Sequence, residues 1–364
     1  MLDVARTYRV ALIGYGYAGR TFHAPLLAAI PRLELAVVAS RDAGKVHADL
    51  PEVEVVVDPL RAVDDERIEL VVIASPNHSH ASLAQAALEA GKHVVVDKPF
   101  TLTLAQARGL AALAARHERL LSVFHNRRWD SDYLSVRRAI EDGLVGEVVH
   151  FESHFDRFRP EVRARWRERA GAGGGLWFDL GPHLIDQALQ LFGLPERINA
   201  DIATQRADGE ADDWAHVVLD YGVKRAILHG SMLVAGGSAR FTVHGTRGSV
   251  VKPRIDRQEA QLLRGLRPGD PGWGEDDDPL LHYDGSDAPP RRIAATAGDQ
   301  CRYYIAIRDA LDGRGDNPVT PLQAIAVMAV LEAAVEAGRD GCARPLPLSE
   351  EERAAWTAAA REQG

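Results

Sequence analysis

Three glycines near the start of the chain have the spacing of a phosphate-binding loop. The stretch "GYGYAG" sets them at Gly14, Gly16 and Gly19, between the apolar run "YRVALI" and the helix-forming run "RTFHAPLLAAI". In a strand–loop–helix unit of the form G-x-G-x-x-G, the glycines allow a tight turn, close approach of a pyrophosphate and close packing of helix on strand. The helix N-terminus adds unpaired N–H groups and a partial positive charge. The sequence therefore predicts that a dinucleotide binds at Gly14, Gly16, Tyr17, Ala18 and Gly19; the alternative is a glycine-rich turn without a ligand.

The end of the next predicted strand bears on the choice of cofactor. NAD sites usually carry Asp or Glu there to bind the adenosine ribose. This chain reads "VVASRDAGK", with Ser40 in that place and Arg41 next. A serine and an arginine can hold a 2′-phosphate, which a carboxylate would repel, although Asp42 could turn toward the ribose of NAD. We therefore expect Ser40 and Arg41 to bind NADP, with NAD as the alternative cofactor.

A lysine follows a later strand. Lys98 in "VVVDKPF" lies just past the carboxyl end of that strand, the edge at which ligands bind in open α/β sheets. The chain has only five lysines among its 43 basic residues, so generic surface charge explains this one less easily. We predict that Lys98 contacts the cofactor and acts in catalysis; the alternative is a solvated lysine beside Pro99, a residue that can take a cis bond. The loop "SPNHSH" after the preceding strand is predicted to contact the cofactor through Ser75, Asn77 and His78.

An aspartate and a histidine lie four residues apart in "GGGLWFDLGPHLIDQ". If the stretch is helical, Asp179 and His183 share one face. If the helix begins at Pro182, a favourable first position, Asp179 lies just before it and can still reach the imidazole. A carboxylate oriented on a histidine fixes its tautomer and supports the imidazolium. The pair predicts proton transfer at His183; the alternative is a buried, hydrogen-bonded structural histidine.

Together these motifs resemble the Gfo/Idh/MocA oxidoreductase family over nearly the whole chain. "GYGYAG", "SPNHSH", "DKP" and "GGGLWFDLGPH" match its cofactor loop, fourth-strand loop, E-K-P motif and G-G-G-x-x-x-D-x-G-x-H motif. "FHAPLL" and "VFHNRRWD" are similar to its NADP-linked scyllo-inositol dehydrogenase-like branch. The resemblance implies hydride transfer between nicotinamide and a carbinol or ketone carbon of a cyclic polyol or sugar, with Lys98, Asp179 and His183 as the catalytic set. Asp97 replaces the glutamate of most members and keeps its charge.

Weaker signals concern the substrate and metals. Asn126 and Trp129 follow the sixth predicted strand and are expected in the pocket. Within "RFRPEVRARWRER", Arg157 could bind a hydroxyl and Trp166 could cover the C–H face of a sugar ring, or the stretch could be a charged loop or subunit contact. No metal site is predicted, because the histidines and two cysteines lack H-E-x-x-H or Cys/His spacing.

The elements that must position these residues fall into two groups. Short apolar strands alternate with Ala/Leu-rich helices up to residue 125, with strands expected at 8–14, 33–40, "EVVVD", 68–75, 93–99 and 120–125. Apolar runs without alternation are typical of parallel strands covered on both faces. We predict an α/β protein whose N-terminal domain, residues 1–125, is a doubly wound (Rossmann) parallel sheet.

The pattern changes near residue 126. After a helix at about 130–141, the stretches "GEVVHFESHFDRF", "HVVLDY", "RAILHGSML" and "ARFTVHGTRGSV" alternate apolar and polar residues. They predict a large, mostly antiparallel open sheet in a C-terminal α+β domain, residues 126–364. Residues 252–298 are expected to form loops, and 299–312 and 321–337 helices that can pack back on the first domain. Apolar residues at alternate positions on the open sheet predict a homodimer, or a tetramer, through that face.

Composition limits the remaining classes. A net charge of −9 argues against nucleic-acid or anionic-membrane partners. Beyond the first strand, no segment is judged to approach the roughly 20 apolar residues of a spanning helix, so we expect a cytoplasmic protein. No tyrosine has a lysine four residues on, which excludes the short-chain dehydrogenase motif, and no cysteine cluster supports a zinc alcohol dehydrogenase. The alternative to a polyol or sugar dehydrogenase is a non-catalytic nicotinamide-sensing regulator.

Overall fold

A computed structural model describes residues 6–362, and the chain folds into two compact units. The first unit contains residues 1–126, 258–273 and 299–324, and the second contains 127–257, 274–298 and 325–364. The predicted boundary at residue 125 therefore lies one residue before the end of the first segment of the first unit. Residues 258–273 and 299–324, which were predicted to belong to the second domain, are also part of the first unit.

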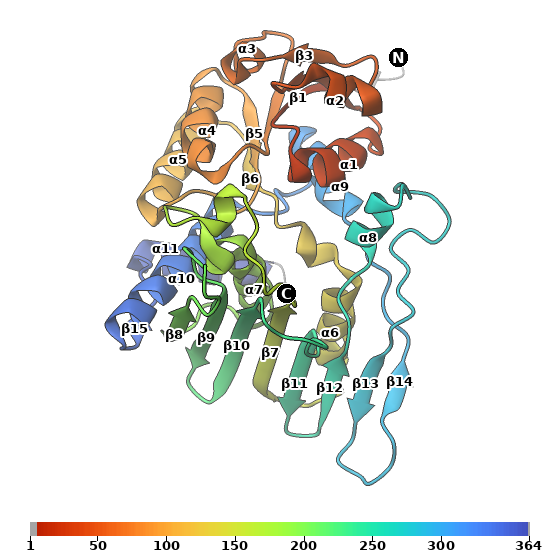
Figure 1. Ribbon diagram of the computed structural model, residues 1–364, viewed down its shortest axis with the longest axis vertical. Helices are drawn as coiled ribbons and strands as arrows, with labels where there is room; N and C mark the ends of the chain where they lie inside the picture. Colours follow the sequence, from red (N-terminus) through yellow and green to blue (C-terminus); the bar gives the residue numbers. More distant parts are fainter. Residues whose placement is uncertain (1–5, 363–364) are drawn as a thin grey trace. The chain divides into compact units, whose positions relative to one another are not determined.

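The first unit is built on a six-stranded sheet (Figure 1). Its order is β3-β2-β1-β4-β5-β6, and every neighbouring pair is parallel. This is the strand order of a doubly wound dinucleotide-binding sheet, which confirms the predicted fold. The apolar centre of the sheet is fully buried, as both-face coverage by helices requires. The strands are β1 (Tyr8–Ile13), β2 (Leu33–Ala39), β3 (Glu54–Val56), β4 (Leu70–Ile73), β5 (His93–Val96) and β6 (Leu121–Val123).

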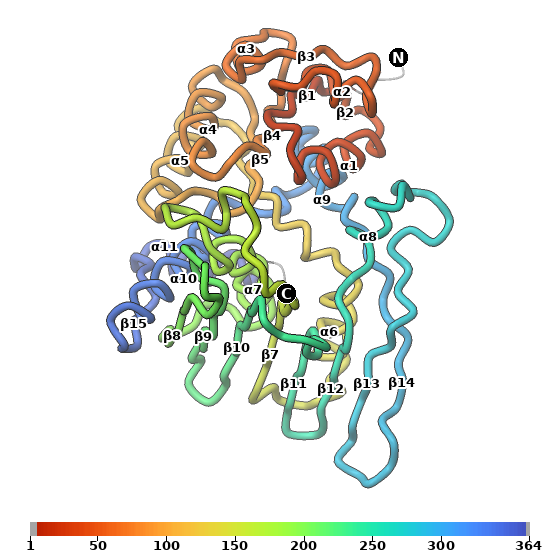
Figure 2. Tube along the Cα trace, viewed as in Figure 1, coloured from red at the N-terminus to blue at the C-terminus, as the bar shows by residue number. Residues whose placement is uncertain are grey.

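The helix after the glycine loop is divided near a proline. A π-helical turn, η1 (Gly19–His23), precedes α1 (Ala24–Ala28), and Pro25 lies in the first turn of α1. Pro25 is tolerated there because the first N–H groups of a helix have no intrahelical partner. Later segments pack beside these turns, because α8 contacts η1 and α9 contacts α1 (Figure 2). The remaining helices of this unit are α2 (Ala43–Asp49), α3 (Pro59–Val63), η2 (Asn77–Ser79), α4 (His80–Glu89), α5 (Leu104–Arg116), α8 (Gln258–Leu263) and α9 (Cys301–Leu311).

The second unit is built on a nine-stranded sheet of order β14-β13-β12-β11-β7-β10-β9-β8-β15 (Figure 1). All neighbouring pairs are antiparallel except β7 and β10, which run parallel. The alternating burial of β7, β9 and β10 shows that one face packs on the core while the other carries polar and half-buried side chains. The strands are β7 (Val148–Asp156), β8 (Arg197–Ala203), β9 (Trp214–Tyr221), β10 (Lys224–Ser231), β11 (Phe241–Gly245), β12 (Gly248–Lys252), β13 (Leu280–Tyr283), β14 (Arg291–Ile293) and β15 (Arg344–Pro345).

Helix α7 (Gly175–Phe192) covers the core face of this sheet and contacts β7, β9 and β10. Its Trp177 is fully buried and donates its indole N–H to the carbonyl oxygen of Leu331 on α10 (Pro321–Asp340), 3.1 Å away. The other helices are η3 (Asn126–Trp129), α6 (Ser131–Glu141), η4 (Trp166–Glu168) and α11 (Glu350–Glu362).

Two expectations from the sequence are corrected. Residues 252–298 are not all loop, because they contain α8, β13 and β14. Strands β13 and β14 extend the nine-stranded sheet. They are short and lie among Pro, Gly and Asp residues, so the sequence pattern did not predict them. Helix α10 is long and apolar enough, by length and composition, to cross a membrane, contrary to the expectation that no such segment exists. Most of α10 is buried inside the protein, and a core helix has the same composition.

Candidate active site

The glycine loop between β1 and η1 has the backbone that a phosphate site needs. Gly14 has a φ of +99°, and a Cβ there would lie 2.7 Å from the carbonyl oxygen of Ala74. A Cβ on Gly19 would collide with the carbonyl oxygen of Gly14, so this glycine permits the close packing of helix on strand. Gly16 differs, because a Cβ there would meet nothing within 4 Å. The backbone therefore packs closely at Gly14 and Gly19, and no such contact is present at Gly16. This arrangement fits the approach of a pyrophosphate to Gly16.

The neighbouring side chains of the loop are open to solvent. Tyr17 is exposed and donates its hydroxyl to the Glu259 carboxylate at 2.6 Å, and Ala18 is partly exposed.

The end of β2 presents hydroxyl and basic groups. Ser40 is partly buried and accepts a hydrogen bond from the backbone N–H of Asp42 at 3.2 Å, and Arg41 is exposed. The Asp42 carboxylate accepts the backbone N–H of Lys45 at 2.9 Å and so caps α2. The Lys45 ammonium donates to the carbonyl oxygen of Tyr15, in the glycine loop, at 3.0 Å. Lys45 therefore joins α2 to the glycine loop, a role that was not predicted from the sequence. Its position four residues after Arg41 could have indicated a second basic group at this site.

Lys98 follows β5, as predicted, and is partly buried. The Lys98–Pro99 bond is cis. The Asp97 carboxylate accepts the backbone N–H of Lys98 at 2.8 Å and lies 3.9 Å from Nε2 of His23. Nδ1 of His23 is 2.6 Å from the Tyr304 hydroxyl, so Asp97, His23 and Tyr304 form a buried polar chain beside Lys98.

The charge of Asp97 is maintained by its neighbours. Burial alone would raise the pKa of Asp97, but the polar interaction with the neighbouring His23 and the charges of Lys98 and His80 hold it below its ordinary value. Burial raises the pKa of Tyr304 well above its ordinary value, so its hydroxyl stays protonated. Asp97 thus remains an anion beside the backbone of Lys98. The shorter side chain keeps the charge that the family's glutamate would supply.

The loop after β4 holds the next three predicted residues. Ser75 shares a hydrogen bond of 2.7 Å with the hydroxyl of Ser79, Asn77 is buried at the start of η2, and His78 is exposed. The sequence did not predict a role for His80, the buried histidine of the same motif. Its Nδ1 lies 2.8 Å from the carbonyl oxygen of Pro99 and its Nε2 2.9 Å from that of Ser75. His80 therefore joins the loop after β4 to the loop after β5.

In the second unit, the predicted catalytic pair lies on one helix. Helix α7 runs through both residues and through Pro182, so the first of the two predicted arrangements is correct and Asp179 and His183 share a helical face. His183 is buried, with its ring edge-on to Phe155 at a centroid distance of 6.3 Å. The Asp179 carboxylate lies 3.5 Å from Nε of Arg167. Arg167, from the arginine-rich stretch, is a further charged group at this position that the sequence did not single out.

The start of α7 is fixed by an acidic residue. Asp212 accepts the backbone N–H of Trp177 at 2.7 Å through its carboxylate and that of Leu176 at 2.8 Å through its carbonyl oxygen. Gly175 has a φ of +90°, and a Cβ there would collide with the Asp212 carboxylate. Burial raises the pKa of Asp212 to about 6. The glycine run before Asp179 thus allows an acidic cap to approach the helix backbone.

The middle of α7 is held by buried arginines. Arg128 donates to both carboxylate oxygens of Asp186, at 2.9 and 2.6 Å, and Gln187 donates to the carbonyl oxygen of Arg127 at 2.9 Å. Such charge-assisted pairs fix orientation as well as position. One turn after His183, α7 is therefore tied to the η3 turn that carries Trp129.

The predicted substrate residues lie on these and adjoining segments. Asn126 is buried and Trp129 partly buried in η3. Arg157 is partly buried, and its backbone pairs with Ser231 and Val234. Trp166 is 38% exposed, with the Arg167 guanidinium 4.7 Å from its ring centroid. Trp166 is therefore partly exposed and stacks with Arg167, the arginine that contacts Asp179.

A cavity of about 620 Å³ lies elsewhere in the first unit. Tyr15, Arg20, Asp49 and Arg267 contribute its polar lining. Arg20 pairs with Asp49 at 2.6 Å, and burial, with the Asp49 charge, raises the pKa of Tyr15 to about 12. None of the residues predicted to bind the cofactor lines this cavity, although Tyr15 belongs to the glycine loop and Arg20 directly follows it.

The predicted residues thus gather as two sets. In the first unit, the glycine loop, the end of β2, the loop after β4 and Lys98 all follow the carboxyl ends of parallel strands of one sheet. In the second unit, Asp179 and His183 lie on α7, and η3 and the arginine-rich stretch hold residues that contact this helix.

Comparisons with known proteins match both units. Residues 8–125 match the Gfo/Idh/MocA family described as "Oxidoreductase family, NAD-binding Rossmann fold", and residues 137–348 match its "C-terminal alpha/beta domain". The chain is 53% identical over 333 residues to the uncharacterized oxidoreductase YdgJ of Escherichia coli, covering 91% of this chain and 96% of that one. It is 37% identical over 338 residues to the scyllo-inositol 2-dehydrogenase (NADP(+)) IolW of Bacillus subtilis, covering 92% and 94%.

A solved structure shows the same architecture. The crystal structure of a putative oxidoreductase from Klebsiella pneumoniae superposes with a TM-score of 0.92 at 61% identity, covering 97% of this chain and 99% of that one. The matches extend over both sheets and over the motifs described above. This chain belongs to the Gfo/Idh/MocA oxidoreductase family and carries its NAD-binding Rossmann domain.

Proposed function

We propose that this protein is an NADP-preferring dehydrogenase that interconverts a CH–OH group and a ketone on a cyclic polyol or sugar. The observation that carries the proposal is the joint presence of a lysine after β5 and an Asp–His pair on one face of α7. A fold that only bound nicotinamide would need the glycine loop but neither of these groups. Two relatives support the substrate class by name: IolW, and a levoglucosan dehydrogenase that is 29% identical over 301 residues.

The proposed chemistry divides between the chain and its cofactor. Bound nicotinamide would supply the acceptor or donor of hydride. His183 takes the hydroxyl proton when the alcohol is oxidised and returns it when the ketone is reduced. Lys98 donates a hydrogen bond to the same oxygen and stabilises the charge that develops there. Asp179 orients the imidazole and favours its protonated form.

The preference for NADP rests on the end of β2. The Asp42 carboxylate already accepts the Lys45 backbone N–H, so the acidic group that could bind a ribose hydroxyl has a structural role. Arg41 and Lys45 add two positive charges, and Ser40 adds a hydroxyl. A 2′-phosphate binds well to such a set because hydrogen bonds between charged partners are the strong ones.

Turnover tests this proposal directly. Purified protein is assayed for NADPH and NADH oxidation with inosose and pyranose ketones, and for NADP and NAD reduction with the matching polyols and sugars. We expect turnover with at least one polyol–ketone pair, faster with the phosphorylated cofactor, and its loss in Lys98→Met. Cofactor binding without turnover on any compound would contradict the proposal and favour a nicotinamide-sensing regulator.

A homodimer, or a tetramer, through the open face of the nine-stranded sheet is part of the same proposal. Trp214, Val218, Ile227 and Val251 occupy alternate, half-buried positions there. An apolar contribution of this kind is common at subunit interfaces. Sedimentation at micromolar concentration should show at least a dimer, and a purely monomeric protein would contradict this part. We place the enzyme in the cytoplasm, where nicotinamide cofactors are supplied.

A further inference from the structure

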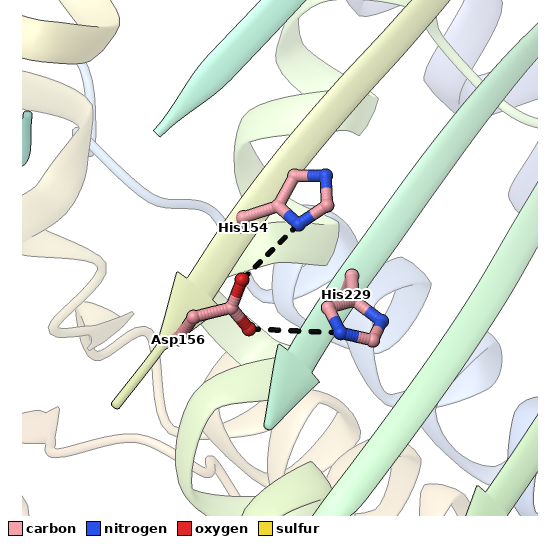
Figure 3. A group of neighbouring side chains, drawn as sticks. All are labelled: His154, Asp156 and His229. Carbon is pink, nitrogen blue, oxygen red and sulfur yellow. Dashed lines mark ion pairs between the residues drawn. The ribbon is translucent and has the colours of Figure 1, made fainter. Parts of the chain in front are cut away.

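The open face of the nine-stranded sheet carries a cluster of two histidines and an aspartate (Figure 3). His154 and Asp156 lie on β7, and His229 lies on β10. These strands form the parallel pair of the sheet, in a register that sets His229 opposite His154. Figure 3 shows the Asp156 carboxylate between the two imidazole rings, facing a nitrogen of each.

The carboxylate at the centre of the cluster contacts the two imidazoles as ion pairs but makes no hydrogen bond of good geometry. The Asp156 side chain is only 3% exposed, and neither of its oxygens has a partner in hydrogen-bond geometry. One oxygen lies 3.4 Å from Nδ1 of His154 and the other 3.6 Å from Nε2 of His229. A buried carboxylate without hydrogen bonds is costly. A bound cation would remove that cost.

The outer contacts of the two histidines leave ligand nitrogens facing Asp156. Nε2 of His154 lies 2.9 Å from the Glu152 carboxylate, which only accepts, so this nitrogen carries the proton. In the neutral imidazole, Nδ1 then presents its lone pair to Asp156. Nδ1 of His229 lies 3.4 Å from Nδ1 of His216, so a proton on that nitrogen leaves Nε2 as the lone pair that faces Asp156. A second hydrogen bond of this kind orients most metal-binding histidines.

Burial and charge shift the pKa values within the group in opposite directions. Burial lowers the pKa of His229 and also that of His216, so both are neutral imidazoles at pH 7. Burial alone would raise the pKa of Asp156, but the polar interactions with His154 and Ser238 and the charge of His229 hold it below its ordinary value. Burial would lower the pKa of His154, but Asp156 and Glu152 outweigh it and raise that pKa. A protonated His154 between two carboxylates is therefore the competing state.

The spacing of the three ligand atoms suits a small divalent ion. Zinc binds histidine and carboxylate at about 2.0–2.2 Å, and tetrahedral geometry then separates ligand atoms by roughly 3.3–3.6 Å. The separations of 3.4 and 3.6 Å involve different oxygens of Asp156, as for a carboxylate that bridges or binds through both oxygens, and one atom from each residue can be chosen so that all three lie within 4.8 Å of one another. In a single chain the side chains of His154 and His229 are 17% and 14% exposed, and because they lie on the face proposed to pair in the dimer, the site would lie at that interface.

We propose that His154, Asp156 and His229 bind a divalent transition-metal ion, with Zn²⁺ as the natural probe and water in the fourth position. Three protein ligands with an open position are a common zinc arrangement. The ion would link β7 to β10, the strands whose pairing breaks the antiparallel pattern of the sheet. The site is separate from Lys98 and the Asp179–His183 pair and does not depend on the proposed dehydrogenase activity.

The test uses Zn²⁺ alone, added to chelator-treated protein in competition with a chromophoric chelator, with Co²⁺ absorption as a second probe. We expect about one tight equivalent and a d–d spectrum of tetrahedral intensity. His229→Gln and Asp156→Asn should abolish that equivalent. Glu152→Gln, which alters only an outer contact, should weaken binding about 10- to 100-fold. His150→Gln is the matched control, because His150 also contacts Glu152, at 2.7 Å, but is not one of the three ligands.

Two further measurements distinguish loss of the metal site from misfolding of a variant. Zinc at 100 times its Kd should raise the Tm of the wild-type protein by roughly 5 °C and leave that of His229→Gln unchanged. A crystal soaked in Zn²⁺ should show an anomalous peak bonded to the three ligand atoms. Absence of that peak, no binding by the wild-type protein, or equal binding by wild type and His229→Gln would overturn the proposal in favour of an ion pair centred on a protonated His154.

Discussion

Nδ1 of His80 lies 2.8 Å from the carbonyl oxygen of Pro99, so a side chain that follows β4 holds the backbone that follows β5. The other ring nitrogen of His80 is 2.9 Å from the carbonyl oxygen of Ser75. Carbonyl oxygens only accept, so each of these contacts uses an N–H of the imidazole. Because Lys98 immediately precedes Pro99, His80 is a positioning residue for the proposed catalytic lysine.

Replacing this buried histidine should destabilise the first unit. His80→Leu leaves two carbonyl oxygens without their donor, and each buried unsatisfied group costs about 1–3 kcal/mol. We expect the free energy of unfolding to fall by roughly 2–5 kcal/mol, measured by urea denaturation. His78→Ala is the control, because His78 is exposed two residues away and should change stability by less than about 0.5 kcal/mol. Equal effects of the two substitutions would show that His80 does not join the loops.

His183 should be needed for proton transfer but not for cofactor binding. In His183→Gln we expect kcat to fall about 10²- to 10⁴-fold, the usual contribution of a general base or acid. Fluorescence titration with NADPH should give a Kd close to that of the wild-type protein, because the glycine loop and the end of β2 lie on the other unit. His244→Gln, at an exposed histidine of β11, is the control. A variant that keeps wild-type kcat would remove His183 from the mechanism.

Arg41 and Lys45 should distinguish the two cofactors. Replacing both with alanine removes two positive charges from the end of β2, and we expect KM for NADP to rise about 10- to 100-fold while KM for NAD changes little. Arg61→Ala, at an exposed arginine of α3, serves as the control for loss of surface charge. The measurement is a pair of steady-state titrations with the same polyol. A parallel loss with both cofactors would place these residues outside the 2′-phosphate site.

Asp212 should make stability depend on pH. Its pKa is about 6 in the folded protein and near 3.8 in the unfolded chain, so the native state holds a proton that the unfolded state releases between these values. The stabilisation from that proton is fully present below about pH 4 and is lost as the pH rises through 6. Relative to Asp212→Asn, the wild-type protein should lose about 2–3 kcal/mol of unfolding free energy between pH 4 and pH 7. Exposed Asp208, changed to Asn, is the control, and a pH-independent difference for Asp212→Asn would contradict the assignment.

The sequence could predict features that depend on local spacing. The glycines of the loop, Lys98 at the end of β5 and the i, i+4 pair on α7 follow from period and position alone, because strand ends and helix faces are local properties. Apolar runs without alternation likewise predicted the parallel sheet, and alternation of apolar and polar residues predicted the second sheet. Strand signals failed for β8, which has seven residues, and for the short strands β13, β14 and β15.

Long-range contacts could not be predicted in the same way. His80 and His78 have the same residue type in one motif, yet one is buried between two carbonyl oxygens and the other is exposed. Asp42 was a candidate ribose ligand in the sequence, and it caps α2 in the structure. Arg167 and Asp212 are brought to the first turns of α7 by chain segments that share no motif with it.

The sequence by itself determined the fold class, the family resemblance and the residues of the proposed reaction, because those follow from periodicity and from motifs within a few residues. Only the tertiary structure decided which polar groups face one another. His154 and His229 are 75 positions apart and lack any metal-binding spacing along the chain, but the register of two parallel strands sets them side by side around one carboxylate. A turn can set the register of neighbouring strands, but β7 and β10 are distant in the chain, so their register is fixed only when both strands bury the same face in the folded sheet.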